Sequence, residues 1–194
     1  MRSAPWWALV FSGCAPVLLV GSWMIAQLLQ GPEYDPASQT LSVLASYGAA
    51  GYWLMTGMLL VLGTCYVVTA HALRPAAPAG RVALAGGGLC ALALTLVPVP
   101  DSGGALEHGA VSTMGLVLLA VWPLLAAVRH RKPVPWGLRP DVSLAASALM
   151  GASALWFLAE LQSEGAPGVA ERVVTFAQAL WPFLVVVSCR RSAA

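Results

Sequence analysis

Six runs of about 20 apolar residues constrain the fold of this 194-residue chain more than any other feature. They cover residues 5–29, 51–70, 82–98, 109–128, 142–161 and 172–188. Only 9% of the residues are charged, whereas a soluble domain carries about 25%. Because lipid offers no hydrogen bonds to the backbone, such runs cross a membrane as helices. The sequence predicts an all-α, polytopic membrane helix bundle of about six transmembrane helices, forming a single domain over residues 1–194.

The basic residues predict the orientation of these helices. Nine of the ten Lys and Arg residues fall in segments that lie on one side: Arg2, Arg74, Arg81, Arg129, Arg131, Lys132, Arg139, Arg190 and Arg191. The positive-inside rule makes that side cytoplasmic, with both termini on it. One lysine, one isoleucine and no asparagine, residues with AT-rich codons, indicate a high-GC bacterium. We expect a multi-pass protein of the bacterial cytoplasmic (inner) membrane.

The opposite, outer side holds the candidate catalytic residues. Seven of the eight acidic residues lie there, and most of them are expected to be solvated loop carboxylates. Glu160 sits one turn after Trp156 at the end of an apolar run, where burial keeps a carboxyl protonated and makes it an available acid. Glu171, which precedes Arg172, suits either the start of the last helix or an ion pair. The candidates are Glu160, Asp101, Asp35, Glu171 and His108.

Several functional classes are unlikely on this sequence. His108 is the only histidine on the outer side, so no metal site is expected. The chain has no Asp-rich diphosphate motif, no P-loop and no GxSxG nucleophile elbow, and we expect no cofactor. A net charge of +2 gives no reason to expect nucleic-acid binding.

Aromatic side chains gather on the outer side as well. An interfacial belt is their ordinary explanation, although Trp23 and Trp181 lie deeper than a belt requires. Aromatic faces also stabilise cations, so these residues are candidates for binding a substrate that passes through a carbocation. The candidate substrate-binding residues are Trp23, Tyr52, Trp53, Trp156, Phe176 and Trp181.

Two further patterns predict local structure. Asp35 is expected to cap, and Pro36 to begin, a short helix that lies at the outer membrane interface. Small residues at 86–88 in the third run and at 148–152 in the fifth run are expected to let helices approach closely.

Three short motifs together resemble a known family. They are Tyr34-Asp35-Pro36 with Gln39-Thr40-Leu41-Ser42, then Val97-Pro98-Val99-Pro100-Asp101 with Glu107-His108-Gly109, and Gly168-Val169-Ala170-Glu171-Arg172-Val173. The chain resembles small bacterial six-helix membrane proteins of unknown function, which are related to the Frag/DRAM/Sfk families. One branch that it resembles is the drimentine-type membrane-bound terpene cyclases.

That branch implies an enzyme. It cyclises a farnesyl chain, carried on the indole of a cyclic dipeptide, by protonating the terminal alkene without loss of diphosphate. A carboxylic acid would supply the proton, with Glu160 and Asp101 ranked first, and His108 would orient the acid or receive the final proton. Two other classes stay open: binding or transport of a lipid or small molecule without catalysis, and assembly with another membrane protein. The sequence does not predict the oligomeric state.

Overall fold

The computed structural model describes residues 4–99, 106–129, 133–163 and 165–192, and these are helical with short connections. The elements are α1 (Trp6–Gln30), α2 (Leu41–Leu44), α3 (Tyr52–Ala72), α4 (Pro78–Leu94), α5 (Leu106–Ala126), η1 (Trp136–Leu138), α6 (Pro140–Ser163) and α7 (Pro167–Arg191). The predicted all-α bundle is confirmed, and each of the six apolar runs forms one long helix.

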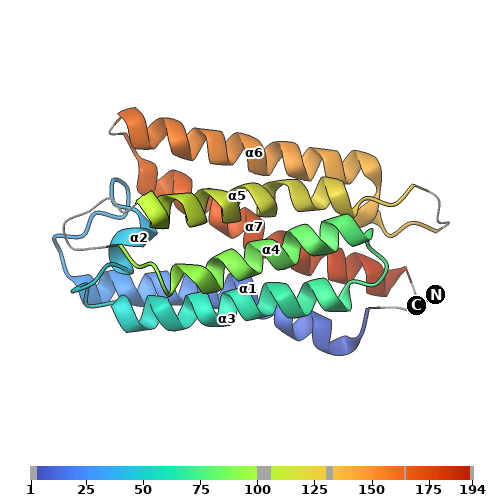
Figure 1. Cartoon of the computed structure of the whole chain (residues 1–194), viewed down its shortest axis with the longest axis horizontal. Helices are drawn as coiled ribbons and strands as arrows, with labels where there is room; N and C mark the ends of the chain where they lie inside the picture. The colour runs from blue at the N-terminus through green and yellow to red at the C-terminus, as the bar shows by residue number, and fades with distance from the viewer. Residues whose placement is uncertain (1–3, 100–105, 130–132, 164, 193–194) are drawn as a thin grey trace.

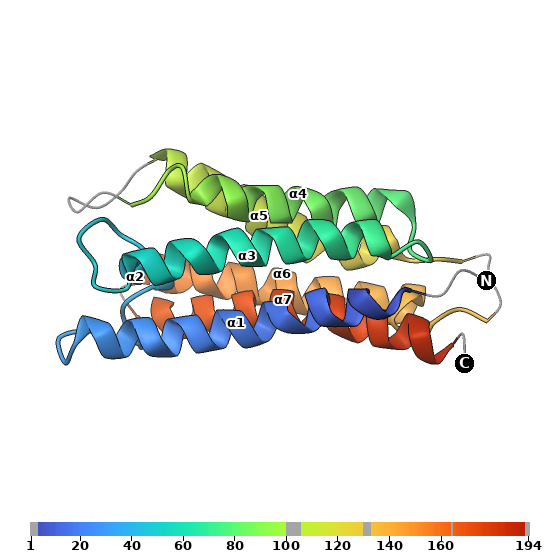
Figure 2. The same cartoon turned by 90° about the horizontal axis from the view of Figure 1, so that it is seen from below.

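The six long helices form a closed ring in chain order. Each packs mainly on the long helix before it and the one after it, and α1 packs on α7 to close the ring. Figures 1 and 2 show the helices running along the long axis in alternating directions, with the start of α1 and the end of α7 at the same end. The short connections make neighbours in the chain antiparallel neighbours in space.

Five of the long helices, α1, α3, α5, α6 and α7, are long and apolar enough to cross a membrane. The predicted third crossing is shorter, because α4 has 17 residues and so spans about 25 Å. Thr95, Leu96 and Val97 extend it by a turn whose N–H groups bond to carbonyls three residues back, which adds about 6 Å. The two together match a hydrocarbon core of about 30 Å. The chain is therefore a multi-pass membrane protein.

The charges separate between the two ends of the ring, as the sequence predicted. We call one end the Arg-rich end; its described basic residues are Arg74, Arg81, Arg129, Arg139, Arg190 and Arg191. The other is the acidic end, with Glu33, Asp35, Glu107, Glu160 and Glu171. At the Arg-rich end, Arg81 donates to the carbonyls of Ala70 and His71 and thereby caps the end of α3.

Glycines set how closely α3 and α4 approach. A Cβ on Gly88 would lie 2.7 Å from the carbonyl oxygen of Gly63, and a Cβ on Gly63 would lie 2.6 Å from that of Gly88. The expected close packing at 86–88 is therefore present. The close helix approach expected at residues 148–152 is not found at Gly151, because a Cβ on Gly151 would have no atom of a neighbouring helix within 4 Å.

The connection between α1 and α3 folds back into the bundle instead of lying on its surface. Asp35 caps a single turn over residues 36–39, and the helix proper, α2, comes later and has one turn. Leu41 and Leu44 of α2 are buried among the long helices. Burial of these two leucines holds α2 against the long helices at the acidic end of the bundle, where Figure 1 shows it.

Candidate functional site

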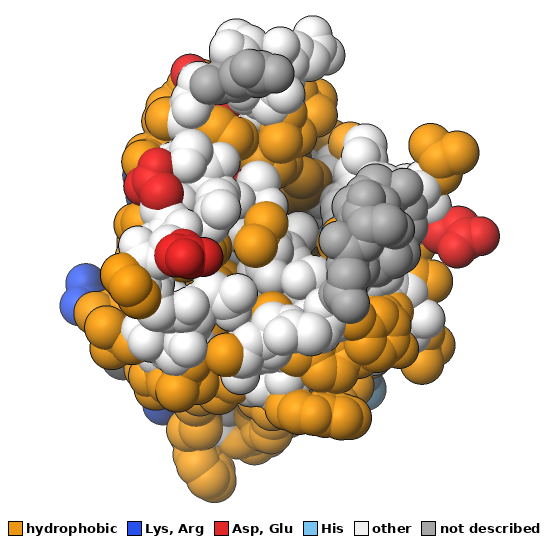
Figure 3. Space-filling model, turned by 90° about the vertical axis from the view of Figure 1, so that its left-hand side faces the viewer, with side chains coloured by type: hydrophobic (Ala, Val, Ile, Leu, Met, Phe, Trp, Pro, Cys, Tyr) orange, Lys and Arg blue, Asp and Glu red, His pale blue; other side chains and the backbone are white. Residues whose placement is uncertain are grey.

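The ring of helices encloses a cavity of about 320 Å³ at its acidic end. All six long helices and α2 contribute to its wall, and the lining is mostly Leu, Met, Ala and Gly. Along α3 the lining runs from Met55 to Tyr66, a distance of about 16 Å at helical rise, so the cavity is elongated along the bundle. Figure 3 views the acidic end and shows a recess with hydrophobic side chains at its bottom.

The cavity divides the hydrophobic core. Most buried residues form one cluster that extends from α1 through α3, α4 and α5 to α7. Phe157, Ala170 and Val174 form a second cluster between α6 and α7, with Leu116 and Ala154 packed against it. Because close-packed interiors leave few voids, a gap between two clusters is a feature that the fold maintains.

The residues around α2 form the roof of this cavity. Leu41 at the start of α2 donates its backbone N–H to Oε2 of Glu171. Ser42 Oγ lies 3.4 Å from Nε2 of His108, and Nδ1 of His108 lies 2.9 Å from the carbonyl oxygen of Val97. Since a carbonyl only accepts hydrogen bonds, Nδ1 carries a proton, and in the neutral ring Nε2 is the basic nitrogen that faces Ser42. Glu171 and His108 both line the cavity.

Arg172 anchors the loop that leads into the roof. Its Nη1 donates to the carbonyl oxygens of Pro36 at 2.9 Å, Gln39 at 3.3 Å and Gly168 at 2.8 Å. Its Nη2 donates to the hydroxyl of Tyr34 at 2.7 Å. Burial raises the pKa of this phenol, so Tyr34 stays neutral and its hydroxyl donates onward to the loop carbonyls.

Gly168 lets the same loop reach α7. Its N–H donates to the carbonyl of Ala37 at 3.0 Å. A Cβ at this position would lie 2.3 Å from the carbonyl oxygen of Gln39 and 2.5 Å from that of Pro36. A glycine is therefore required where the loop carbonyls approach the first turn of α7. Described residues from all three motifs that the sequence singled out thus meet at one place, the roof of the cavity.

Comparison with known protein families gives one match. The model of the family described as a protein of unknown function (DUF998) matches residues 14–188. The chain belongs to this family. No curated protein and no solved structure matches the chain. The resemblance to a membrane family of unknown function is therefore confirmed, and the family description assigns no activity.

Only part of the predicted catalytic set of this DUF998 protein lies at the cavity. Glu171 and His108 line it. Glu160 lies outside the lining, where Oε1 accepts from Trp156 Nε1 at 2.9 Å and Oε2 from the N–H of Ala166 at 2.6 Å. This carboxylate therefore closes the connection between α6 and α7 and satisfies the backbone at the start of α7.

Asp35 also has a structural position. Its carboxylate accepts from Ser38 Oγ at 2.6 Å and from the N–H groups of Ala37 and Ser38. These bonds, first of all the one from the Ser38 hydroxyl, lower the pKa of the Asp35 carboxyl, so it is ionised at neutral pH and unsuited to donate a proton. Asp101 lies outside the described residues.

None of the six predicted aromatic residues lines the cavity. Tyr52 and Trp53 form a cluster with Tyr47 at the start of α3. Trp156 contacts Glu160, and Trp181 packs edge-on against Trp136 with ring centroids 6.2 Å apart. Trp23 and Phe176 line an apolar groove between α1 and α7, where the guanidinium of Arg172 lies over the Trp23 ring. The aromatic residues that do line the cavity are Tyr66 and Phe157.

Sequence reasoning missed two polar residues deep in the cavity, Gln178 and Tyr66. Gln178 is buried and donates from Nε2 to the carbonyl of Leu116 at 3.0 Å. It could have been found, because it is the single amide in the apolar run 172–188, and polar groups inside membrane spans mark sites. Tyr66 gives no such signal, since one tyrosine in a span is compatible with ordinary packing.

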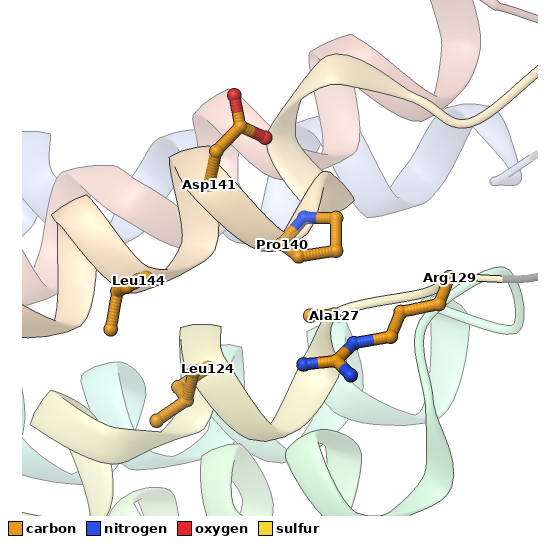
Figure 4. A pocket seen from close by; sticks show the side chains of 6 residues that line it. All are labelled: Leu124, Ala127, Arg129, Pro140, Asp141 and Leu144. Atoms are coloured by element: carbon orange, nitrogen blue, oxygen red, sulfur yellow. The ribbon is translucent and has the colours of Figure 1, made fainter.

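A second hollow, of about 470 Å³, lies between α5 and α6 at the Arg-rich end. Figure 4 shows its six lining residues, among them Arg129 and Asp141, whose charged groups point in different directions. Asp141 lies in the first turn of α6, where a carboxylate favours the helix N-terminus. Because this hollow contains none of the family motifs, the cavity at the acidic end is the candidate functional site.

Arg172→Gln is expected to loosen the loop that leads into the roof while the ring of helices stays intact. A hydrogen bond from a charged donor is worth roughly 1.5–3 kcal/mol. Its loss should make the loop open more often, so that the protected amides between residues 36 and 41 exchange about 10- to 100-fold faster. Hydrogen–deuterium exchange with mass spectrometry measures this. Arg190→Gln is the matched control, because Arg190 bonds to the carbonyl of Ala4 at the other end. Equal exchange in both variants would show that Arg172 does not hold the loop.

Proposed function

We propose that this protein binds an elongated amphiphile in the central cavity, with its polar end at the roof and its hydrocarbon chain in the interior. The observation that carries the proposal is the cavity itself, an apolar space of about 320 Å³ with a carboxyl and an imidazole at one end. Sites for small molecules are mostly apolar, have a few polar groups, and start at about 300 Å³. The elongated shape fits an acyl or isoprenoid chain.

The energy of the cavity supports an occupant. Sealed and dry, a void of 320 Å³ would cost about 8 kcal/mol at roughly 24 cal/mol per Å³. That cost is comparable to the whole stability of an ordinary domain, which is roughly 5–15 kcal/mol. An apolar space of this size favours being filled by a hydrocarbon chain over being empty, which supports an apolar ligand.

The polar groups define what the cavity recognises. Oε2 of Glu171 accepts the Leu41 N–H, and this is the one hydrogen bond that its carboxyl group makes within the described residues. Ser42, Ser112 and Thr175 line the same region. A free carboxyl oxygen beside hydroxyl groups favours a ligand whose polar end carries a hydroxyl or an N–H.

The orientation in the membrane follows from the charges. By the positive-inside rule we assign the Arg-rich end to the cytoplasm, and the proposal then has the roof and the cavity in the outer half of a bacterial cytoplasmic membrane. The ligand is then drawn from molecules dissolved in the bilayer.

A second candidate function is protonation-initiated terpene cyclisation, and the position of Glu171 favours it. Here the protonated carboxyl transfers H⁺ to the terminal alkene of a prenyl chain, and the next double bond attacks the tertiary cation. Loss of a proton from the cyclised cation completes an isomerisation with no change in mass. Tyr66 and Phe157 supply aromatic faces inside the cavity, and Nε2 of His108 is a base within the lining.

Leu116→Trp is expected to abolish ligand binding by filling the cavity from α5. A C15 isoprenoid alcohol at 100 times its dissociation constant stabilises a one-site protein by about 2.7 kcal/mol. Thermal unfolding in detergent, followed by far-UV circular dichroism, measures this stabilisation. Val117→Trp is the matched control, because Val117 is 52% exposed on the same helix and does not line the cavity. Stabilisation that survives in Leu116→Trp would place the binding elsewhere.

Glu171→Gln distinguishes catalysis from binding. Glutamine keeps an oxygen for the Leu41 N–H but has no acidic proton, so cyclisation should fall by about 10²- to 10⁴-fold. Membranes containing the protein are incubated with a farnesylated tryptophan cyclic dipeptide, and liquid chromatography with mass detection follows an isomer of equal mass. Glu160→Gln is the control and should retain activity. If no isomer forms with wild-type protein while the substrate binds, the chain is a binding protein without this activity.

A further inference from the structure

We infer that the ligand enters the cavity sideways from the lipid. The opening lies between α5 and α6, in the parts of these helices that are nearest the acidic end. This inference rests on the proposed function. It adds the route of entry, and it therefore requires a ligand that is dissolved in the membrane.

The exposed part of the cavity wall lies on these two helices. Among the described lining residues, those that are also exposed are Gly109 and Thr113 of α5 and Leu158 and Leu161 of α6. Leu158 and Leu161 are 42% and 47% exposed. The other described lining residues, on α1, α3, α4 and α7 and around α2, are buried or half-buried. We call these four exposed residues the lateral opening.

At the Arg-rich end, beside the second hollow, a hydrogen bond joins α5 to α6. There the backbone N–H of Leu124 donates to Oγ of Ser147 at 3.0 Å. Within the described residues this is the one hydrogen bond that joins the two helices. At the acidic end the core is split, because Phe157 of α6 packs with α7 in the second cluster and not with the main core. The two helices can therefore separate there without breaking hydrogen bonds.

The roof covers part of the bundle end that faces water. Leu41 contacts Glu171 on α7, and Ser42 contacts His108 on α5. The next segment is fixed as well, since Tyr47 donates its backbone N–H to the carbonyl of Val99 at 3.1 Å. By contrast, the lateral opening is lined by leucine side chains and contains one polar side chain, Thr113. A hydrocarbon chain passes such an opening from the bilayer without entering water, which fits an apolar ligand.

Cys90 provides a reporter inside the cavity, on α4. The wild-type protein in liposomes is treated with N-dodecylmaleimide, which dissolves in the bilayer, and labelling of Cys90 is followed by peptide mass spectrometry. Leu161→Trp and Thr113→Trp narrow the lateral opening from its two sides. We expect each to slow Cys90 labelling by about tenfold, equivalent to about 1.4 kcal/mol of added barrier. Leu155→Trp is the matched control, since Leu155 is 69% exposed on α6 and does not line the cavity.

The outcomes separate the route from the function. A C15 isoprenoid alcohol should protect Cys90 in the wild type; if it fails to protect, the proposed binding function is wrong. If it protects but neither tryptophan slows labelling, the site is right and the lateral route is wrong. Labelling by a charged, water-soluble maleimide at the rate of the lipid-soluble one would also overturn the route, because it would show entry past α2. Cys14 on α1 serves as the internal control for maleimide delivery.

Discussion

The adjacent pair Glu171 and Arg172 determines how the acidic end of this protein is built. Backbone groups within a membrane must find partners in the protein, because lipid offers none. The loop between α1 and α3 turns towards the ring, and side chains from one turn of α7 form hydrogen bonds with its backbone N–H and carbonyl groups. Glu171 accepts an N–H at the start of α2, and Arg172 donates to the carbonyls of the preceding turn. An acceptor and a donor that are adjacent on α7 thus satisfy an N–H group and two carbonyl groups of the loop backbone.

The roof and the cavity follow from this arrangement. With the loop fixed to α7, α2 lies across the ring and brings Ser42 towards His108. The helices below it carry small residues and leave a space that no side chain fills. The result is an apolar cavity whose polar groups are concentrated under the roof, a distribution that matches the two ends of an amphiphile.

Much of the fold could be predicted from the sequence, because hydropathy alone locates membrane helices. The six runs, the separation of charges and the role of glycine at 86–88 all follow from local patterns. The position of α2 could not be predicted, because burial of Leu41 and Leu44 depends on the packing of helices that are distant in the sequence.

The candidate site was predictable only in part for the same reason. Glu160 and Glu171 look alike in sequence, each at the outer end of an apolar run. In the structure, Glu160 bonds within the connection between α6 and α7, whereas Glu171 lines the cavity. Most of the predicted aromatic residues lie at the correct end of the bundle, whereas Trp181 packs on Trp136 of η1; the faces that they occupy depend on how the ring closes. The three motifs did predict residues of the roof, because residues from different motifs form hydrogen bonds with one another there.

The most direct test of this account is infrared difference spectroscopy of the protein with and without a bound C15 isoprenoid alcohol. If the polar end of the ligand lies under the roof, binding should shift a carboxyl band of the wild type. That band should be missing in Glu171→Gln and unchanged in Glu160→Gln. A ligand that binds and stabilises the protein while every carboxyl band stays in place would contradict the account, because the cavity beside Glu171 would not be its site.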